Sequence, residues 1–391
     1  MTGDEARPDR GDIIEIGGPI REDGTPRRRR PPWLLWLPLV LLAGIGLAVY
    51  ARTDGGPERP VTTPSATGSP AVPGASTAPT GTAPVVTEVG RPLLGITDGY
   101  ELYGRGPDSV VRIEFAKGRV TVTPVPTLAS SGAVNFLVGP DLVVIRPRDA
   151  VPGYVVPDGK PAERAREDFN RSGPMLPGPD PGSVWVTADD VRGAMLLVRF
   201  DGKHTGVAVA APPGTGGFAE PDGAGYPSIA TTGGVYSLRP DGVRRMTTGE
   251  LLAVGPTHWL ARECDERLRC GGVLIEQRGG ARRPVRLPAG GVGMSGGVVS
   301  GDAARAALLV AGPGGSPRVH LLDLRSGADR PVDLPVDASL NPLAWSPDGR
   351  WLFAAGLDGQ LHTVDPATAE VRDLGVRLPQ IGQVVIRPAA R

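Results

Sequence analysis

The sequence has little of the side chains that most often carry catalysis, metal binding or recognition of charged polymers. Among 391 residues there are two cysteines, four histidines and three lysines, and aromatic residues make up 5%. The 42 basic and 42 acidic residues cancel, so the net charge gives no reason to expect a nucleic-acid partner. No metal site is predicted, because the histidines share no ligand spacing: His204, His258, His320 and His362.

Glycine and proline, in contrast, are abundant, with 57 and 43 residues, and so many helix breakers exclude a mainly helical protein. After residue 90 they divide the chain into a recurring unit of an apolar strand, a turn with glycine or aspartate, and a second strand. We count seven such hairpins. Their spacing of about 43 residues is typical of four-stranded β-sheet blades.

The most specific pattern is the stretch 345–353, which places a tight turn between two apolar strands. The turn comprises Trp345, Ser346, Pro347, Asp348, Gly349 and Arg350. Proline presets φ for the turn, and glycine accepts a positive φ at its end. The pattern resembles the repeat of WD40-like, TolB-type β-propellers, in which Trp-Ser-Pro-Asp-Gly-Arg precedes an apolar strand. A weaker copy occupies residues 301–309.

This resemblance implies that residues 90–391 form one all-β domain, a seven-bladed β-propeller of four-stranded antiparallel blades. The first unit lacks an inner strand of its own, while a spare strand follows the seventh hairpin. We therefore predict that residues 384–387 pair with the first blade and close the ring, since closure removes two open sheet edges.

The N-terminal part predicts a membrane anchor. Residues 1–32 are polar and are expected to be a disordered cytoplasmic tail. The apolar run 33–50 has no charge and as a helix would span about 27 Å, close to the roughly 30 Å hydrocarbon layer. A single transmembrane helix is therefore predicted, with a cleaved signal peptide as the alternative.

Four consecutive arginines precede this run: Arg27, Arg28, Arg29 and Arg30. We interpret them as a topology signal that keeps the tail in the cytoplasm and places the rest of the chain outside, although they could also bind anionic lipid headgroups. Residues 51–89 are rich in proline, threonine and serine and predict a disordered linker.

The two cysteines, Cys264 and Cys270, lie six residues apart between two apolar strands. Outside the membrane this arrangement predicts a disulfide across a hairpin loop. A redox or metal-binding pair would require the closer C-x-x-C spacing or histidine partners.

Two enzyme fingerprints overlap in the chain. Residues 293–297 satisfy G-x-S-x-G and residues 291–296 satisfy G-x-G-x-x-G. A hydrolase and a dinucleotide site would each need a helix after the motif, but residues 297–301 are glycines, valines and serine, which favour a strand or turn. We interpret the stretch as a connection between blades, and predict no catalytic or cofactor-binding residues.

The resemblance implies a rigid platform for protein or peptide binding. We therefore expect a non-catalytic binding or scaffold module, anchored in the cell membrane by one helix, whose extracytoplasmic propeller binds an envelope protein or polymer. No cofactor is expected. The alternative is an extracytoplasmic propeller enzyme, either a hydrolase or a quinoprotein-like oxidoreductase.

Overall fold

The computed structural model describes residues 81–126, 134–147, 152–171, 173–188, 193–212, 218–219, 221–288, 293–312 and 316–388. Besides strands, these residues form short 3₁₀ turns: η2 (Leu93–Gly95), η3 (Phe115–Lys117), η4 (Glu167–Asn170) and η6 (Ala338–Leu340). Within these ranges no helix has the length and hydropathy needed to cross a membrane. The predicted tail, transmembrane helix 33–50, topology signal Arg27 to Arg30 and most of the linker lie outside the described residues.

The strands form six sheets, as predicted for an all-β domain. The first sheet contains, in spatial order, β1 (Val85–Glu88), β4 (Arg119–Pro124), β3 (Ser109–Glu114), β2 (Glu101–Arg105) and β29 (Gln383–Arg387). The second comprises β5 (Val134–Val138), β6 (Leu142–Pro147), β7 (Tyr154–Pro157) and β8 (Glu163–Arg164). The third comprises β9 (Met175–Pro177), β10 (Ser183–Thr187), β11 (Ala194–Arg199) and β12 (His204–Ala210).

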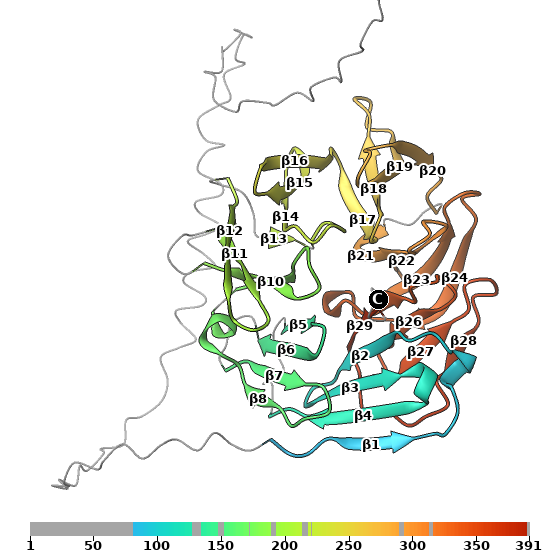
Figure 1. Ribbon diagram of the computed structural model, residues 1–391. Helices are drawn as coiled ribbons and strands as arrows, with labels where there is room; N and C mark the ends of the chain where they lie inside the picture. Colours follow the sequence, from blue (N-terminus) through green and yellow to red (C-terminus); the bar gives the residue numbers. More distant parts are fainter. Residues whose placement is uncertain are drawn as a thin grey trace, which may run out of the picture. The chain divides into compact units, whose positions relative to one another are not determined.

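The fourth sheet comprises β13 (Phe218–Ala219), β14 (Ser228–Thr231), β15 (Gly234–Arg239) and β16 (Gly242–Thr247). An eight-stranded sheet contains β17 (Glu250–Val254), β18 (His258–Cys264), β19 (Cys270–Glu276), β20 (Arg282–Val285), β21 (Gly293–Val299), β22 (Arg305–Ala311), β23 (Pro317–Asp323) and β24 (Asp329–Pro335). The last sheet comprises β25 (Leu343–Trp345), β26 (Leu352–Ala355), β27 (Leu361–Val364) and β28 (Val371–Asp373). Figure 1 shows these sheets arranged around a common centre, as in a β-propeller.

Burial explains why the strands have different compositions. A strand covered on both faces by neighbouring sheets can be a continuous apolar run, as is β26, whose four residues are all buried. The outer strands alternate or are polar; all four residues of β1 are exposed. Among the described residues, buried side chains form seven clusters between successive groups of strands. Trp185 and Ile229, for example, belong to one cluster that joins the third and fourth sheets.

The eight-stranded sheet corrects the predicted blade count. Five sheets have four or five strands and are separate blades, but the strands expected for a fifth and a sixth blade form one sheet. They join through a parallel pair, in which Ala253 of β17 lies opposite Gly297 of β21. A Cβ atom at Gly297 would lie 2.6 Å from the Leu252 carbonyl oxygen, so only glycine permits this approach. The prediction of seven separate four-stranded blades is therefore wrong.

Strand β29 closes the ring as predicted. It pairs antiparallel with β2, with Leu102 opposite Ile386 and Gly104 opposite Val384, and it supplies the inner strand that the first sheet otherwise lacks. At the outer edge of the same sheet, β1 pairs with β4. The linker predicted over residues 51–89 therefore ends earlier than expected, because its valines at 85 and 86 favour a strand.

Candidate functional site

The stretch 345–353 forms a turn between β25 and β26 that is held by its own side chains. The hydroxyl of Ser346 donates to Asp348 Oδ1 (2.5 Å) and accepts from the backbone N–H of Trp351 (2.9 Å). Gly349 has a φ of 67°, in the region that glycine tolerates best. Trp345 Nε1 donates to the carbonyl oxygen of Val298 (3.1 Å) in the adjacent sheet. The signature residues therefore fold the turn and fasten it to its neighbour.

The weaker copy of the signature has the same geometry. Between β21 and β22, the hydroxyl of Ser300 donates to Asp302 Oδ1 (2.6 Å) and accepts from the backbone N–H of Arg305 (3.0 Å). Burial would raise the pKa of Asp302, but the bond from Ser300 and a backbone N–H lower it. The carboxylate of Asp302 thus accepts hydrogen bonds from within its own turn and has a structural role there.

The structure also reveals turns of this kind that sequence analysis missed. Each follows an inner strand and contains a Pro-Asp pair: Pro140 and Asp141, Pro179 and Asp180, and Pro221 and Asp222. The signal was present in the sequence, but without the neighbouring tryptophan and arginine it could not be distinguished from other turns. Asp222 is buried, and its Oδ2 accepts from Ser237 (2.8 Å) and Arg239 (3.1 Å).

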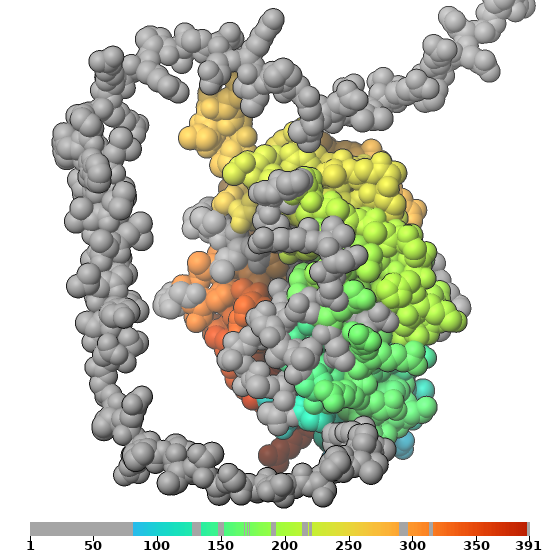
Figure 2. Space-filling view, turned by 90° about the vertical axis from the view of Figure 1, so that its left-hand side faces the viewer, coloured from blue at the N-terminus to red at the C-terminus, as the bar shows by residue number. Residues whose placement is uncertain are grey.

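The predicted disulfide joins Cys264 and Cys270 at the end of the hairpin formed by β18 and β19. Between them, Asp265 accepts hydrogen bonds from the backbone N–H groups of Arg267 and Arg269, each 2.9 Å long. Leu268 at the tip has a φ of 58°, unusual for a residue other than glycine, and is 83% exposed. Figures 1 and 2 show this hairpin, in gold, projecting from the body of the domain.

A second group of polar side chains lies where β29 meets the first two sheets. Arg387 forms ion pairs with Glu101 and with Asp158, and its guanidinium lies 4.7 Å from the ring centre of Tyr103. Arg112 pairs with the same Glu101 at 2.6 Å. Burial raises the pKa of Tyr103, whose hydroxyl oxygen lies 3.0 Å from a carboxylate oxygen of Glu101 and of Asp158 and shares its one hydrogen between them. This network links three separate chain segments, so its role is structural: it holds β29 to the first two sheets. We call it the Arg387 lock.

Both enzyme fingerprints end on a strand, and residues 291 and 292 of the second one lie outside the described part of the chain. Gly293–Val299 forms β21 and runs through the Ser300 turn directly into β22, so no helix follows either motif. The helix N-terminus that would bind a pyrophosphate, and the strand-to-helix turn of a hydrolase, are both replaced by a β-hairpin.

The four histidines lie on four different strands, two of which, β18 with His258 and β23 with His320, belong to the eight-stranded sheet. His320 Nδ1 lies 3.0 Å from Asp329 Oδ1, and His362 Nε2 lies 3.1 Å from Asp358 Oδ2. In the part of the chain that the structure describes, no group of three or more His, Cys, Asp or Glu side chains is placed to hold a metal ion.

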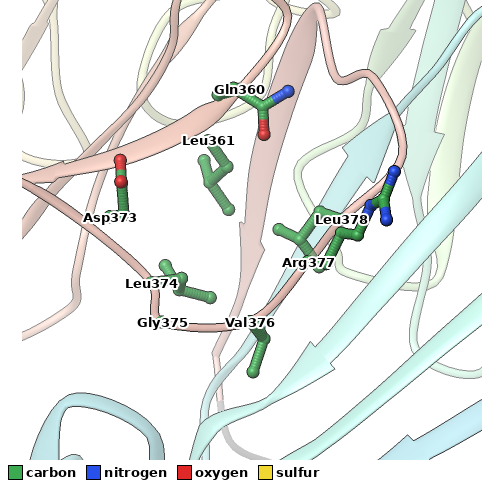
Figure 3. Close-up of a pocket in the computed structure, with 8 residues that line it drawn as sticks. All are labelled: Gln360, Leu361, Asp373, Leu374, Gly375, Val376, Arg377 and Leu378. Carbon is green, nitrogen blue, oxygen red and sulfur yellow. The ribbon is translucent and has the colours of Figure 1, made fainter.

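A small pocket of about 270 Å³ lies beside β27 and β28 (Figure 3). Its lining residues are Gln360, Leu361, Asp373, Leu374, Gly375, Val376, Arg377 and Leu378. Ligand pockets are usually about 300–1,000 Å³ and have several polar groups that converge. Here Asp373 and Arg377 lie on different sides of the space (Figure 3), so the pocket lacks that convergence.

Similarity of this chain to known proteins is found among solved structures, at low sequence identity. No protein-family model and no curated protein sequence matches the chain. Among solved structures, it is similar to TolB from Acinetobacter baumannii, with 15% identity over 75% of this chain and 84% of that one and a TM-score of 0.41. It is also similar to apo AztD from Citrobacter koseri, with 14% identity over 74% and 98% of the two chains and a TM-score of 0.39.

A putative 6-phosphogluconolactonase from Bacteroides fragilis is similar as well, with 10% identity over 74% of this chain and 99% of that one and a TM-score of 0.44. At these values no activity follows from the similarity.

Proposed function

We propose that this chain is a non-catalytic binding module, held at the outer face of a cell membrane by residues 33–50, whose propeller docks an envelope protein. The observation that carries the proposal is the stapled hairpin of β18 and β19. Its tip presents one large apolar side chain, Leu268, that is 83% exposed.

The hairpin is preorganised for such a contact. The disulfide fixes its two strands, and Asp265 binds the backbone N–H groups of the loop. The backbone strain at Leu268 is tolerated without any gain in apolar burial within the domain, and strain of this kind tends to persist where a function requires it. A rigid loop loses little entropy on binding, so a single apolar anchor can bind tightly.

The charges at the tip indicate what kind of surface it fits. Asp265 is neutralised by Arg269 at 2.7 Å, and Arg267 and Glu266 stand beside Leu268 with opposite charges. A tip without net charge and with one leucine is poorly suited to an anionic membrane, which attracts clusters of cations. An apolar pocket on a protein, with a mixed polar rim, matches it better.

We further infer that β17–β20 and β21–β24 pack against each other like neighbouring blades of the ring, although they share one sheet. Support comes from the buried clusters, one of which, with Leu252 and Leu308, lies between these two groups of strands. A ring of this kind would hold the hairpin in a fixed direction, as a scaffold requires.

The proposal is tested by placing a photo-crosslinking amino acid at position 268 of the full-length chain in native membranes. A position on the outer strand β16, Val243, is 50% exposed and serves as the control. We expect one envelope protein to be captured from position 268 and not from 243. The purified partner should then bind the wild-type chain, with a Kd at least about tenfold weaker for Leu268→Ser and unchanged for Val243→Ser.

Equal capture from both positions, or equal affinity of both variants, would contradict the assignment of the hairpin. Capture of lipid alone would indicate a membrane-inserting tip instead. Turnover of an ester, glycoside or redox substrate by the purified chain would support the enzyme alternative.

A further inference from the structure

Arg105, at the end of β2, is a buried cation without a carboxylate partner. Its side chain is 8% exposed, and its Nε donates to Oε1 of Gln383 at 3.2 Å. In the described part of the chain, no acidic side chain lies within ion-pair distance of it. Burial lowers the pKa of Arg105, and no neighbouring charge opposes this effect. Such a group is costly to keep unless something compensates it.

Two other sheets also carry an arginine on the second strand, opposite a polar residue near the start of the inner strand. They show how the charge of a guanidinium at this place can be compensated. In the eight-stranded sheet, Arg262 lies directly opposite Glu250 on the inner strand, and the two form an ion pair at 2.6 Å. In the first sheet, Arg105 lies directly opposite Gln383. In the second, Arg146 lies opposite Asn135, and its Nη2 donates to the Gly173 carbonyl oxygen. At Arg105 an amide thus occupies the place of the carboxylate.

The remaining donors at this place are available. The Nη nitrogens of Arg105 bind no described residue and keep a small contact with solvent. Because Oε1 of Gln383 accepts from Arg105, its amide N–H₂ is a further donor beside the guanidinium. Val110, which lies directly opposite Arg105 on β3, is buried and apolar, so a bound anion would be weakly screened.

We propose that Arg105 and Gln383 form a binding site for a carboxylate group of a ligand. A guanidinium offers two parallel N–H groups whose spacing matches the two oxygens of a carboxylate. One positive charge balances one carboxylate, whereas a phosphate dianion would call for a second cation. The ligand thus supplies the negative charge that Glu250 supplies to Arg262 within the chain.

The test follows the thermal midpoint of the full-length chain, in a non-ionic detergent near pH 7, during titration with sodium acetate. Sodium chloride keeps the ionic strength constant. A ligand that binds only the folded chain raises the midpoint with concentration. We expect acetate to stabilise the wild type, and Arg105→Gln to weaken the apparent affinity at least about tenfold.

Two further variants make the result specific. Arg262→Gln, at the corresponding place with an internal partner, should be less stable but respond to acetate as the wild type does. Gln383→Glu should bring a carboxylate to Arg105, raise the midpoint without acetate and abolish the response. This second variant still decides the matter if Arg105→Gln does not fold.

A response that persists in both Arg105→Gln and Gln383→Glu would overturn the proposal, as would the absence of any response in the wild type. Equal stabilisation by acetate, chloride and inorganic phosphate would show a general salt effect and refute a site. Stronger stabilisation by phosphate would refute the carboxylate assignment. None of these outcomes depends on a protein partner, so they are independent of the hairpin's role.

Discussion

Arg105 and Arg387 project from the same face of the β2–β29 strand pair, one opposite Gln383 and the other opposite Glu101. Burial would lower the pKa of Arg387, but hydrogen bonds and charges from Asp158 and Glu101 raise it. At Arg105, burial acts without opposition. Thus one end of the closing strand is locked by ion pairs, and the other end retains an uncompensated charge.

Removing the ion pairs of Arg387 with Glu101 and Asp158 should destabilise the domain. We expect Arg387→Gln to lower the free energy of unfolding by about 3 kcal/mol, because it leaves Glu101 and Asp158 facing each other with less positive charge between them. Urea denaturation measures this. The control is Arg372→Gln, whose partner Glu370 is about half exposed, as Arg372 is; it should leave the midpoint nearly unchanged. Equal losses in the two variants would contradict the Arg387 lock.

Glu114 should make the domain sensitive to acid. Burial would raise its pKa, but hydrogen bonds from Arg119 and Lys117 lower it to about 2 from an ordinary 4.5. Because the folded pKa is the lower one, this carboxylate stabilises the fold above about pH 4.5, and the contribution is lost as pH falls from 4.5 towards 2. The full loss is on the order of 3 kcal/mol.

Denaturation midpoints measured between pH 7 and pH 2.5 test this expectation. Glu114→Gln should lower the stability at pH 7 and flatten the profile below pH 4.5. Glu370→Gln, at an exposed pair, should change the profile much less. If the Glu114→Gln profile stays parallel to that of the wild type, the carboxylate is not the source of the acid sensitivity.

The serines of the two signature turns, Ser346 and Ser300, should contribute about equally to the stability of the domain. Ser346→Ala removes a bond to Asp348 and leaves the Trp351 N–H without its acceptor, so we expect a loss of about 1–2 kcal/mol. Ser300→Ala should cost about the same, since its bonds match. The control is Ser339→Ala, at an exposed serine, which should lower the free energy of unfolding by less than about 0.5 kcal/mol. Thermal unfolding of the three variants decides; a harmless Ser346→Ala would refute the structural role.

The parallel pairing of β17 with β21 should require glycine at position 297. In Gly297→Ala the new Cβ would lie 2.6 Å from the Leu252 carbonyl oxygen and 2.7 Å from that of Ala307, so we expect destabilisation by about 2 kcal/mol. Hydrogen exchange should rise along both strands. Gly271→Ala, where nothing lies within 4 Å of the new atom, should have little effect. Similar behaviour of both variants would show that the close approach is unimportant.

The features that the sequence predicted are those with a local cause. Apolar runs between turn residues predicted the strands, two nearby cysteines predicted the disulfide, and a surplus strand predicted the closure by β29. The parallel pair of β17 and β21 was missed because it depends on the approach of two strands around Gly297, and no periodicity of either strand records this approach.

The candidate sites were less predictable, because they join residues remote in the chain. Arg387 and Glu101 are 286 positions apart, and Arg105 and Gln383 are 278 apart. Each is an ordinary polar residue of an amphipathic strand until the register of β2 and β29 is known. The exposed Leu268 was likewise hidden, since its exposure follows from the shape of a stapled loop.

The long separation between β2 and β29 has a consequence for biosynthesis. At about 5–20 residues per second, a ribosome needs roughly 15–55 seconds to make the 278 residues between Arg105 and Gln383. Throughout that time the edge of β2 that later pairs with β29 has no partner, although the other edge can pair with β3. Another extended segment can occupy this open edge. The first sheet can therefore be completed, and the ring closed, only after β29 has been made near the end of synthesis.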